Sequence, residues 1–337
     1  MPVNRSQRRH RVHRNFVIMA ALALLVVIGF VASDYFERQS QVQERGQLTS
    51  GIGQRKRVEY NGHTYVEKTN LTTILLMGVD NTADSQAYGA RQGGQADFLQ
   101  LLVIDHNNKT ISQLQIDRDT ITPVEMLGVL GNPVGTREMQ ISLSHGFGRT
   151  EEDCCSNTVK AAENLLEGVV IDYYMALNMD AIGKLNNVLG GVTVTLVDDD
   201  LASEDPAMVK GATLKLTDEQ AELMVRARMS VGEGTNEERM ARQRLFMNAA
   251  IDMMRDRLKE SANFAGELLD ALETDMTSSI KRGKLMNEAN QAYSFDVLPV
   301  ATLAGEHVIG SDGFMEFHVA DGAAADWVMQ AYYDLLN

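Results

Sequence analysis

Short apolar runs that begin on, end on or lead into an aspartate recur in the first half of the chain. Three of them occupy residues 74–80, 97–104 and 111–116. Each is rich in strand-forming residues and has the length of a buried strand. Because ligands bind at strand ends in open α/β sheets, we expect Asp80, Asp97 and the Arg118-Asp119 pair to lie at one edge of a sheet. The alternative is that these aspartates are ordinary turn residues.

The rest of the pattern alternates between helical and strand periodicity. The expected helices cover residues 156–166, 180–189, 237–258, 265–272, 280–292 and 323–336, and the expected strands cover 169–177, 192–197 and 297–303. Asn61-Gly62 between two alternating segments predicts a β-hairpin. Thr217 and Gln220 form a capping box that begins another helix. The fold class is therefore α/β, a layered α/β/α domain with a central mixed sheet.

Two segments lack a regular pattern. Residues 121–150 contain Pro123 and Pro133 and predict a long loop, whose length marks it as functional or flexible. The acidic run 198–205 lacks the glycine and glutamate spacing of a calcium-binding EF-hand and predicts a solvated turn.

The N-terminus differs sharply from the rest in charge and hydropathy. Residues 1–15 carry five arginines and no acid, and the apolar run that follows predicts a transmembrane helix over 16–33. A cleaved signal peptide is the competing interpretation. The basic flank places the N-terminus in the cytoplasm and the C-terminal part outside it. Residues 34–57 are mostly polar and predict a stalk.

The remainder of the chain is strongly acidic. Removing the five N-terminal arginines from the formal net charge of −15 leaves −20. A nucleic-acid-binding protein needs a basic face, so we exclude nucleic acid as a partner. We expect one α/β domain over residues 58–258, with a C-terminal extension over 259–337 packed on it.

One face of the long helix predicted over residues 237–258 is suited to a phosphate ligand. Arg239, Arg242, Gln243 and Phe246 recur at helical spacing. Arginine donates two parallel hydrogen bonds to phosphate oxygens and keeps its charge when buried. Salt bridges within the helix are the alternative for these arginines.

Two further features carry candidate chemistry. Cys154 and Cys155 are adjacent, and they form a strained vicinal disulfide, stay reduced, or are buried as small apolar residues. His145 is a candidate base, with an ordinary solvated loop histidine as the alternative.

Several of these segments together carry a family resemblance. GVD at 78–80, the strand that Asp97 begins, RDT at 118–120, VRARM at 225–229 and ERMARQ at 238–243 resemble the LytR-CpsA-Psr family in the same order. Similar proteins are membrane-anchored, extracytoplasmic phosphotransferases. They move a glycopolymer, such as a teichoic acid or a capsular polymer, from a polyprenyl-pyrophosphate carrier to peptidoglycan. The resemblance implies that activity here, with pyrophosphatase activity when water is the acceptor.

The resemblance also assigns roles to single residues. We expect Arg118, Asp97 and Asp80 to be catalytic, with Mg²⁺, or Mn²⁺, on Asp80 and Asp97, because hard cations take oxygen ligands. The residues expected to bind the pyrophosphate are Arg91, Arg118, Arg226, Arg228, Arg239, Arg242 and Gln243. For Arg226 and Arg228 the alternative is a solubilising role at a helix end.

The sequence departs from the family pattern at two positions. Gln95 stands where similar proteins usually have arginine, and Asp117 stands where they usually have proline. Asp117 removes a rigid backbone angle, which predicts a looser strand end, and it adds an acid that can help to hold a metal. These departures motivate an alternative function: a binding or regulatory protein of the cell envelope that holds the lipid-linked glycan with little turnover.

Overall fold

The computed structural model describes residues 55–80, 94–128, 132–179, 181–227, 231–261, 263–282 and 295–336. The predicted tail, the predicted transmembrane helix and nearly all of the stalk lie outside these ranges. Arg91, Arg228 and most of the helix expected over residues 280–292 also lie outside the described residues. Within the described ranges, no helix combines the length and the apolar character that crossing a membrane requires.

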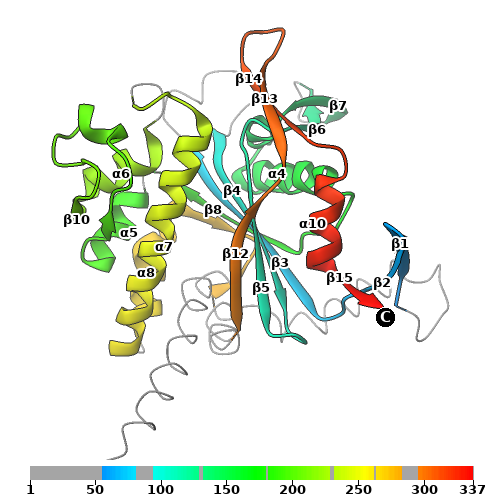
Figure 1. Ribbon diagram of the computed structural model, residues 1–337, viewed down its shortest axis with the longest axis horizontal. Helices are drawn as coiled ribbons and strands as arrows, with labels where there is room; N and C mark the ends of the chain where they lie inside the picture. Colours follow the sequence, from blue (N-terminus) through cyan, green and yellow to red (C-terminus); the bar gives the residue numbers. More distant parts are fainter. Residues whose placement is uncertain are drawn as a thin grey trace, which may run out of the picture.

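A six-stranded sheet forms the centre of the molecule (Figure 1). Its strands are β3 (Leu71–Asp80), β4 (Gln95–Asp105), β5 (Thr110–Ile116), β8 (Tyr173–Asn178), β11 (Met276–Ser278) and β12 (Asp296–Thr302). Their spatial order is β11-β8-β3-β4-β5-β12. The pairs β3–β8 and β5–β12 are parallel, whereas β3–β4, β4–β5 and β8–β11 are antiparallel. The prediction of a central mixed sheet is therefore confirmed.

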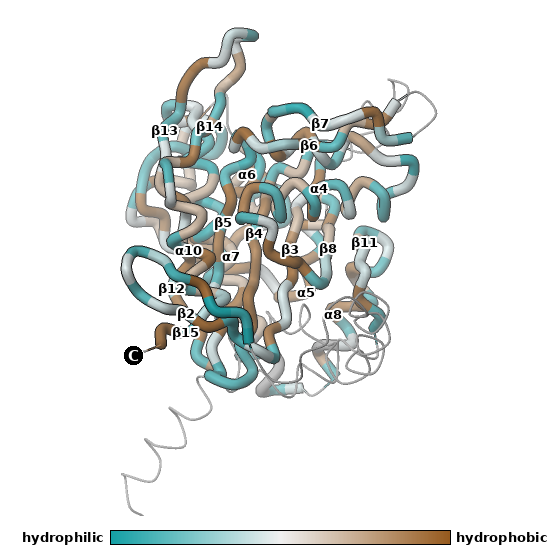
Figure 2. Tube along the Cα trace, turned by 90° about the vertical axis from the view of Figure 1, so that its right-hand side faces the viewer, coloured by the Kyte–Doolittle hydropathy of each residue, from teal (hydrophilic) through white to brown (hydrophobic). Residues whose placement is uncertain are grey.

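Helices cover both faces of this sheet (Figure 1). They are α4 (Glu151–Leu165), α5 (Ala181–Leu189), α6 (Asp218–Arg226), α7 (Asn236–Glu260), α8 (Phe264–Leu272) and α10 (Ala323–Tyr332). One core packs Leu101 and Leu114 against α4 and α10, and the other packs Leu102 and Ile111 against α5 to α8. Because successive strand residues point to opposite faces, both faces need apolar residues, and Figure 2 shows the central strands as hydrophobic runs.

Smaller antiparallel sheets surround this core. They pair β2 (His63–Glu67) with both β1 (Arg57–Tyr60) and β15 (Tyr333–Leu336), β6 (Ile121–Leu127) with β7 (Pro133–Gln140), β9 (Thr193–Thr195) with β10 (Thr213–Lys215), and β13 (Gly305–Ile309) with β14 (Met315–Val319). The β1–β2 turn confirms the predicted hairpin, because Asn61 and Gly62 both have the positive φ that a type I′ turn needs, 48° and 77°. The β13–β14 hairpin projects from the end of the molecule where α7 begins (Figure 1).

The prediction of a long loop over residues 121–150 is wrong. Its two prolines mark the pair β6–β7 instead, followed by the 3₁₀ helix η3 (Ile141–Gly146). Pro133 begins β7, a position that a strand tolerates because no preceding ladder bond is lost. Helix α4 also begins earlier than predicted, where the side chain of Thr150 accepts a hydrogen bond from the backbone N–H of Asp153.

Two further segments, the strand expected over residues 192–197 and the helix expected over residues 323–336, differ from the prediction. Strand β9 is shorter than the strand expected over residues 192–197, and within the described residues it pairs only with β10, outside the central sheet. The helix expected over residues 323–336 stops at Tyr332, and the last described residues form β15 beside β2. Pairing with the N-terminal hairpin therefore overrides the helical pattern at the C-terminus.

Candidate functional site

Three strand ends meet at one edge of the central sheet. Asp80, the last residue of β3, pairs with Gln95 at the start of β4, and Leu99 of β4 pairs with Ile116 at the end of β5. Strand β5 then delivers Arg118 to this edge. The predicted meeting of Asp80, Asp97 and Arg118 at one sheet edge therefore follows from the strand register.

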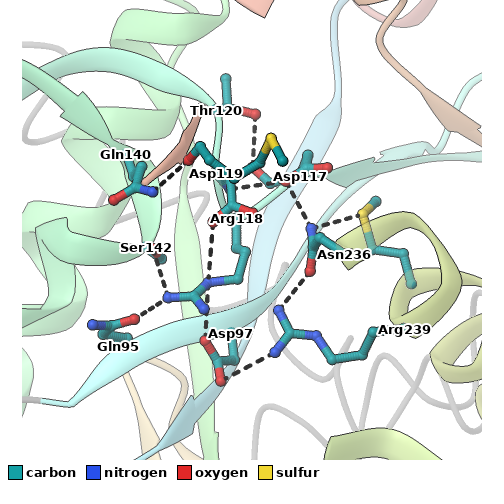
Figure 3. A network of polar contacts seen from close by, with 12 residues as sticks. Gln95, Asp97, Asp117, Arg118, Asp119, Thr120, Gln140, Ser142, Asn236 and Arg239 are labelled. Atoms are coloured by element: carbon teal, nitrogen blue, oxygen red, sulfur yellow. Dashed lines mark hydrogen bonds and ion pairs between the residues drawn. The ribbon is translucent and has the colours of Figure 1, made fainter. Parts of the chain in front are cut away.

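Arg118 lies at the centre of a polar network (Figure 3). Its Nε lies 3.0 Å from Asp97 Oδ1 and 3.7 Å from Asp119 Oδ1. Its Nη2 donates to Ser142 Oγ at 3.2 Å and to the side-chain oxygen of Gln95. The Arg118 side chain is only 12% exposed. The guanidinium is therefore held in one orientation by partners from β4, η3 and its own strand end.

The N-terminal turn of α7 brings a second arginine to the same carboxylate. Arg239 Nη1 lies 3.6 Å from Asp97 Oδ2, and Arg239 Nη2 donates to Asn236 Oδ1 at 2.5 Å. Arg239 is 4% exposed. Asp97 thus lies between two nearly buried guanidinium groups, which is a favourable place for an anion. The capping of α7 by Thr235 fixes where this turn begins.

Other predicted ligands of the pyrophosphate have different partners. Arg242 Nη1 lies 3.1 Å from Asp200, and its Nη2 donates to the backbone oxygen of Ala227 at 2.6 Å. Gln243 donates to the backbone oxygen of Val225 at 3.2 Å, and Phe246 lies in the core. These side chains do share one buried face of α7, as predicted. Arg242 and Gln243, however, hold the end of α6 on α7.

The acidic run is therefore not merely a solvated turn. Residues Asp200–Ser203 form the 3₁₀ helix η4, and Asp200 pairs with Arg242, which is 3% exposed. Burial, followed by the charges of Asp198 and Glu238, raises the pKa of Asp200, and Arg242 opposes that rise. The sequence pattern missed this pairing because Asp200 and Arg242 are far apart along the chain.

Arg226 and Asp80 form an outer ion pair at this edge. Arg226 Nη2 lies 3.3 Å from Asp80 Oδ1, and both side chains are about one-third exposed, at 33% and 38%. Such an exposed pair contributes little to stability, so either group can turn toward a ligand at low cost. Asp80 and Asp97 lie on paired strands, but the described residues contain no group of three or more candidate metal-ligating side chains.

Asp117 is tied down on several sides. Its Oδ1 accepts hydrogen bonds from Asn236 Nδ2 at 2.7 Å and from the backbone N–H of Asp119 at 2.8 Å. Its Oδ2 lies 2.9 Å from Nε2 of His307. The expectation of a loose strand end is therefore wrong. Both oxygens have protein partners, so this acid is poorly placed to bind a metal as well.

His145 and the two cysteines are buried beside the network. His145 is fully buried in η3, its Nε2 lies 3.6 Å from Cys155 Sγ, and burial lowers its pKa to about 4 despite an opposing contact with the backbone of Gly94. The interpretation of a solvated loop histidine is therefore wrong. Both thiols are free and buried, and burial raises the pKa of Cys154 to about 12 and that of Cys155 as well. They behave as small apolar residues, one of the expected alternatives.

An apolar pocket lies between the sheet and α5, α7 and α8. It encloses about 890 Å³, including open solvent at its mouth. Six methionines contribute to its wall: Met77, Met175, Met179, Met247, Met254 and Met276. Gly78, Phe98 and Gln243 also line it, and they lie within one turn or two residues of Asp80, Asp97 and Arg239 along the same elements. The pocket and the charged network are therefore built on neighbouring residues of β3, β4 and α7.

Three residues of the network were missed by sequence reasoning. Asn236 lies three residues before Arg239, so helical spacing could have placed it on the same face of α7. Ser142 and His307 had no such signal, because they reach the site from η3 and from the C-terminal hairpin.

The chain resembles known proteins along nearly its whole length. It is 23% identical over 325 residues to the polyisoprenyl-teichoic acid–peptidoglycan teichoic acid transferase TagU of Bacillus cereus, covering 92% of this chain and 94% of the relative. TagV of Bacillus subtilis, with the same transferase name, is 24% identical, covering 90% of this chain and 73% of the relative.

Solved structures show the same fold. The protein gbs0355 of Streptococcus agalactiae aligns with a TM-score of 0.62 at 23% identity, covering 77% of this chain and 86% of that protein. The crystal structure of Bacillus subtilis TagV aligns with a TM-score of 0.56 at 22% identity, covering 79% and 97%. The model of the LytR_cpsA_psr family matches residues 35–321. The chain therefore belongs to the LytR-CpsA-Psr family.

Proposed function

We propose that this chain is a glycopolymer transferase whose donor is a polyprenyl-pyrophosphate-linked glycan and whose acceptor is peptidoglycan. The observation that carries the proposal is that the apolar pocket and the network around Arg118 and Arg239 use neighbouring residues of β3, β4 and α7. A ligand with an apolar chain and an anionic head fits this pair of surfaces. The names of the relatives, which specify a polyisoprenyl-linked teichoic acid and peptidoglycan, support the same donor and acceptor classes.

The charge balance of the site supports a divalent cation. Three described arginines, Arg118, Arg226 and Arg239, face four aspartates, Asp80, Asp97, Asp117 and Asp119. Such a set has no surplus positive charge for a pyrophosphate. Asp80 and Asp97 lie on the paired strands β3 and β4, and their carboxylates are the oxygen ligands that a hard cation takes. Asp80 and Asp97 would hold Mg²⁺, or Mn²⁺, together with phosphate oxygens and water, and the ion would neutralise charge on the pyrophosphate.

The protein's part in the reaction is positioning and charge stabilisation. Arg118 and Arg239 hold the pyrophosphate while the prenyl chain lies in the methionine-lined pocket. A sugar hydroxyl of the acceptor attacks the phosphorus attached to the glycan, and the bond to the bridging oxygen breaks. Polyprenyl phosphate leaves with that oxygen, and the hydroxyl proton passes to the carboxylate of Asp80 or Asp97. Water in place of the sugar hydroxyl gives pyrophosphate hydrolysis.

The membrane context completes the proposal. A carrier with a polyprenyl chain resides in a bilayer, so an enzyme that acts on it gains from a membrane anchor. We assign that anchor to residues 16–33, with the basic residues 1–15 in the cytoplasm and the α/β domain outside the cell membrane.

A transfer assay tests this function. The full-length chain in detergent is incubated with a short-chain polyprenyl-pyrophosphate oligosaccharide, a peptidoglycan fragment and Mg²⁺, and the release of prenyl phosphate is measured. Arg118→Ala should abolish release. Arg149→Ala is the control and should leave release unchanged, because the Arg149 side chain lies just before α4 and is 69% exposed. Chelation of the metal should stop the reaction. If Arg118→Ala releases prenyl phosphate as fast as the wild type does, the active site lies elsewhere.

Gln95 motivates a second candidate, a protein that binds the lipid-linked glycan with little turnover. The side-chain oxygen of Gln95 accepts a hydrogen bond from Arg118, whereas arginine in its place would add a cation. Gln95→Arg should therefore raise the rate of transfer if too little positive charge limits turnover. Tight binding of the donor with no transfer in either protein would favour the binding function.

A further inference from the structure

The β13–β14 hairpin packs on the strand end that carries Arg118. The backbone N–H of Phe317 donates to the backbone oxygen of Asp119 at 2.8 Å, and Gln140 donates to the backbone oxygen of Met315 at 2.6 Å. Thr120 and Phe317 also form an isolated parallel bridge. A C-terminal segment, almost 200 residues away in the sequence, thus supports the candidate site directly.

His307 is the side chain through which this hairpin reaches the network. Its Nε2 lies 2.9 Å from Asp117 Oδ2, its Nδ1 lies 3.7 Å from Glu237 Oε1, and its ring packs on Phe317 with centroids 4.8 Å apart. The Asp117 side chain is 6% exposed. Because a carboxylate oxygen can only accept, Nε2–H of His307 is the donor in this pair.

Asp117 passes this constraint to Arg239 through one amide group (Figure 3). Asn236 Nδ2 donates to Asp117 Oδ1 at 2.7 Å, so Asn236 Oδ1 must face the other way. That oxygen accepts from Arg239 Nη2 at 2.5 Å, while Arg239 Nη1 lies 3.6 Å from Asp97. The polarity of the Asn236 amide thereby sets the orientation of the Arg239 guanidinium.

We propose that His307 is a positioning residue that orients Arg239 toward the pyrophosphate through Asp117 and Asn236. Without the His307 donor, the buried Oδ2 of Asp117 lacks a partner, and the carboxylate turns to recruit another donor. Asn236 already donates to this carboxylate, so its amide moves with the carboxylate and the acceptor that holds Arg239 is lost. This inference rests on the proposed function, because it takes a prenyl pyrophosphate as the ligand of Arg239.

The hairpin supplies matched variants. His307→Phe keeps a ring that packs on Phe317 but cannot donate, and His307→Gln keeps an N–H donor. His318→Phe is the control, because His318 lies on the neighbouring position of β14, is about half exposed and contacts Glu316. The measurement is the binding of farnesyl pyrophosphate to the full-length chain in detergent with Mg²⁺, by titration calorimetry.

We expect His307→Phe to weaken binding by about tenfold, His307→Gln to restore most of the loss, and His318→Phe to leave the dissociation constant unchanged. In an Arg239→Ala background, His307→Phe should add little further loss, since residues in one network are not additive. A purely structural role would give the same loss in both backgrounds, and that result would overturn the proposal.

The outcomes separate this inference from the proposed function. If wild-type protein and His307→Phe bind farnesyl pyrophosphate with the same dissociation constant, the positioning role is refuted and the proposed function stands. Wild-type protein that binds no farnesyl pyrophosphate would refute the proposed function, and the role of His307 with it.

Discussion

Replacing Asp97 with asparagine should destabilise the folded domain, because two guanidinium groups depend on this carboxylate. Arg118 and Arg239 lie 3.0 Å and 3.6 Å from it, with side chains only 12% and 4% exposed. Removing one partner of a buried ion pair costs about 3–5 kcal/mol, since the remaining charge stays buried. Asp97 itself is 17% exposed, so we take the lower end, about 3 kcal/mol of unfolding free energy.

Urea denaturation measures this loss, followed by the fluorescence of Trp327, the single tryptophan of the chain. Asp270→Asn is the matched control, because Asp270 forms an ion pair with Arg282 in which both side chains are about half exposed or more. Exposed pairs are screened by water, so this control should lower the unfolding free energy by less than about 1 kcal/mol.

Inorganic pyrophosphate extends the test to the proposed ligand. An anion between Arg118 and Arg239 replaces the missing carboxylate, so it should stabilise Asp97→Asn. A ligand at one hundred times its dissociation constant adds about 2.7 kcal/mol of stability, close to the expected loss. Asp97→Asn protein with wild-type stability, or with no response to pyrophosphate, would contradict the assignment of Asp97 and its two arginines to an anion site.

Two other positions give independent predictions. A Cβ at Gly78 would lie 2.8 Å from Met179 Sδ and 3.0 Å from Phe98 Cβ, so Gly78→Ala should narrow the pocket. The variant should bind farnesyl pyrophosphate more weakly and inorganic pyrophosphate as tightly as the wild type does. Equal weakening of both ligands in calorimetry would contradict the pocket assignment. Burial lowers the pKa of His145 to about 4, below its unfolded value of about 6.5. The unfolded state therefore takes up the proton first, and the unfolding free energy should fall by about 2 kcal/mol between pH 7 and pH 5, with the slope ending near pH 4. Urea titrations at several pH values check this, and His145→Asn should flatten the dependence.

The elements that carry the network were predictable because local patterns specify them. Strands β3, β4 and β5 follow from apolar runs, and the capping box at Thr217 and the helical spacing of Arg239 and Gln243 place α6 and α7. The family pattern then singled out Asp97 and Arg118. Hydrophobic periodicity and capping act within a few residues, so a single sequence can express them.

Segments whose structure depends on distant partners were predicted poorly. Strands β6 and β7 were interpreted as a loop, and Tyr333–Leu336 as helix, because their partner strands were not recognised. The interpretations of Asp117 as a source of looseness and of His145 as a solvated side chain failed for the same reason. Burial and hydrogen-bond partners are properties of the assembled molecule.

The sequence alone determined which residue types lie at the strand ends and on α7, and through them the family. Only the tertiary structure decided which of these residues meet: Asp97 lies between Arg118 and Arg239, Arg242 turns away to Asp200, and His307 arrives from the C-terminal hairpin. The physical reason is the separation along the chain between the residues that interact. Periodicity and capping are encoded between neighbours along the chain, whereas ion pairs and buried polar networks need groups that only the packing of sheet, helices and hairpin brings within hydrogen-bonding distance.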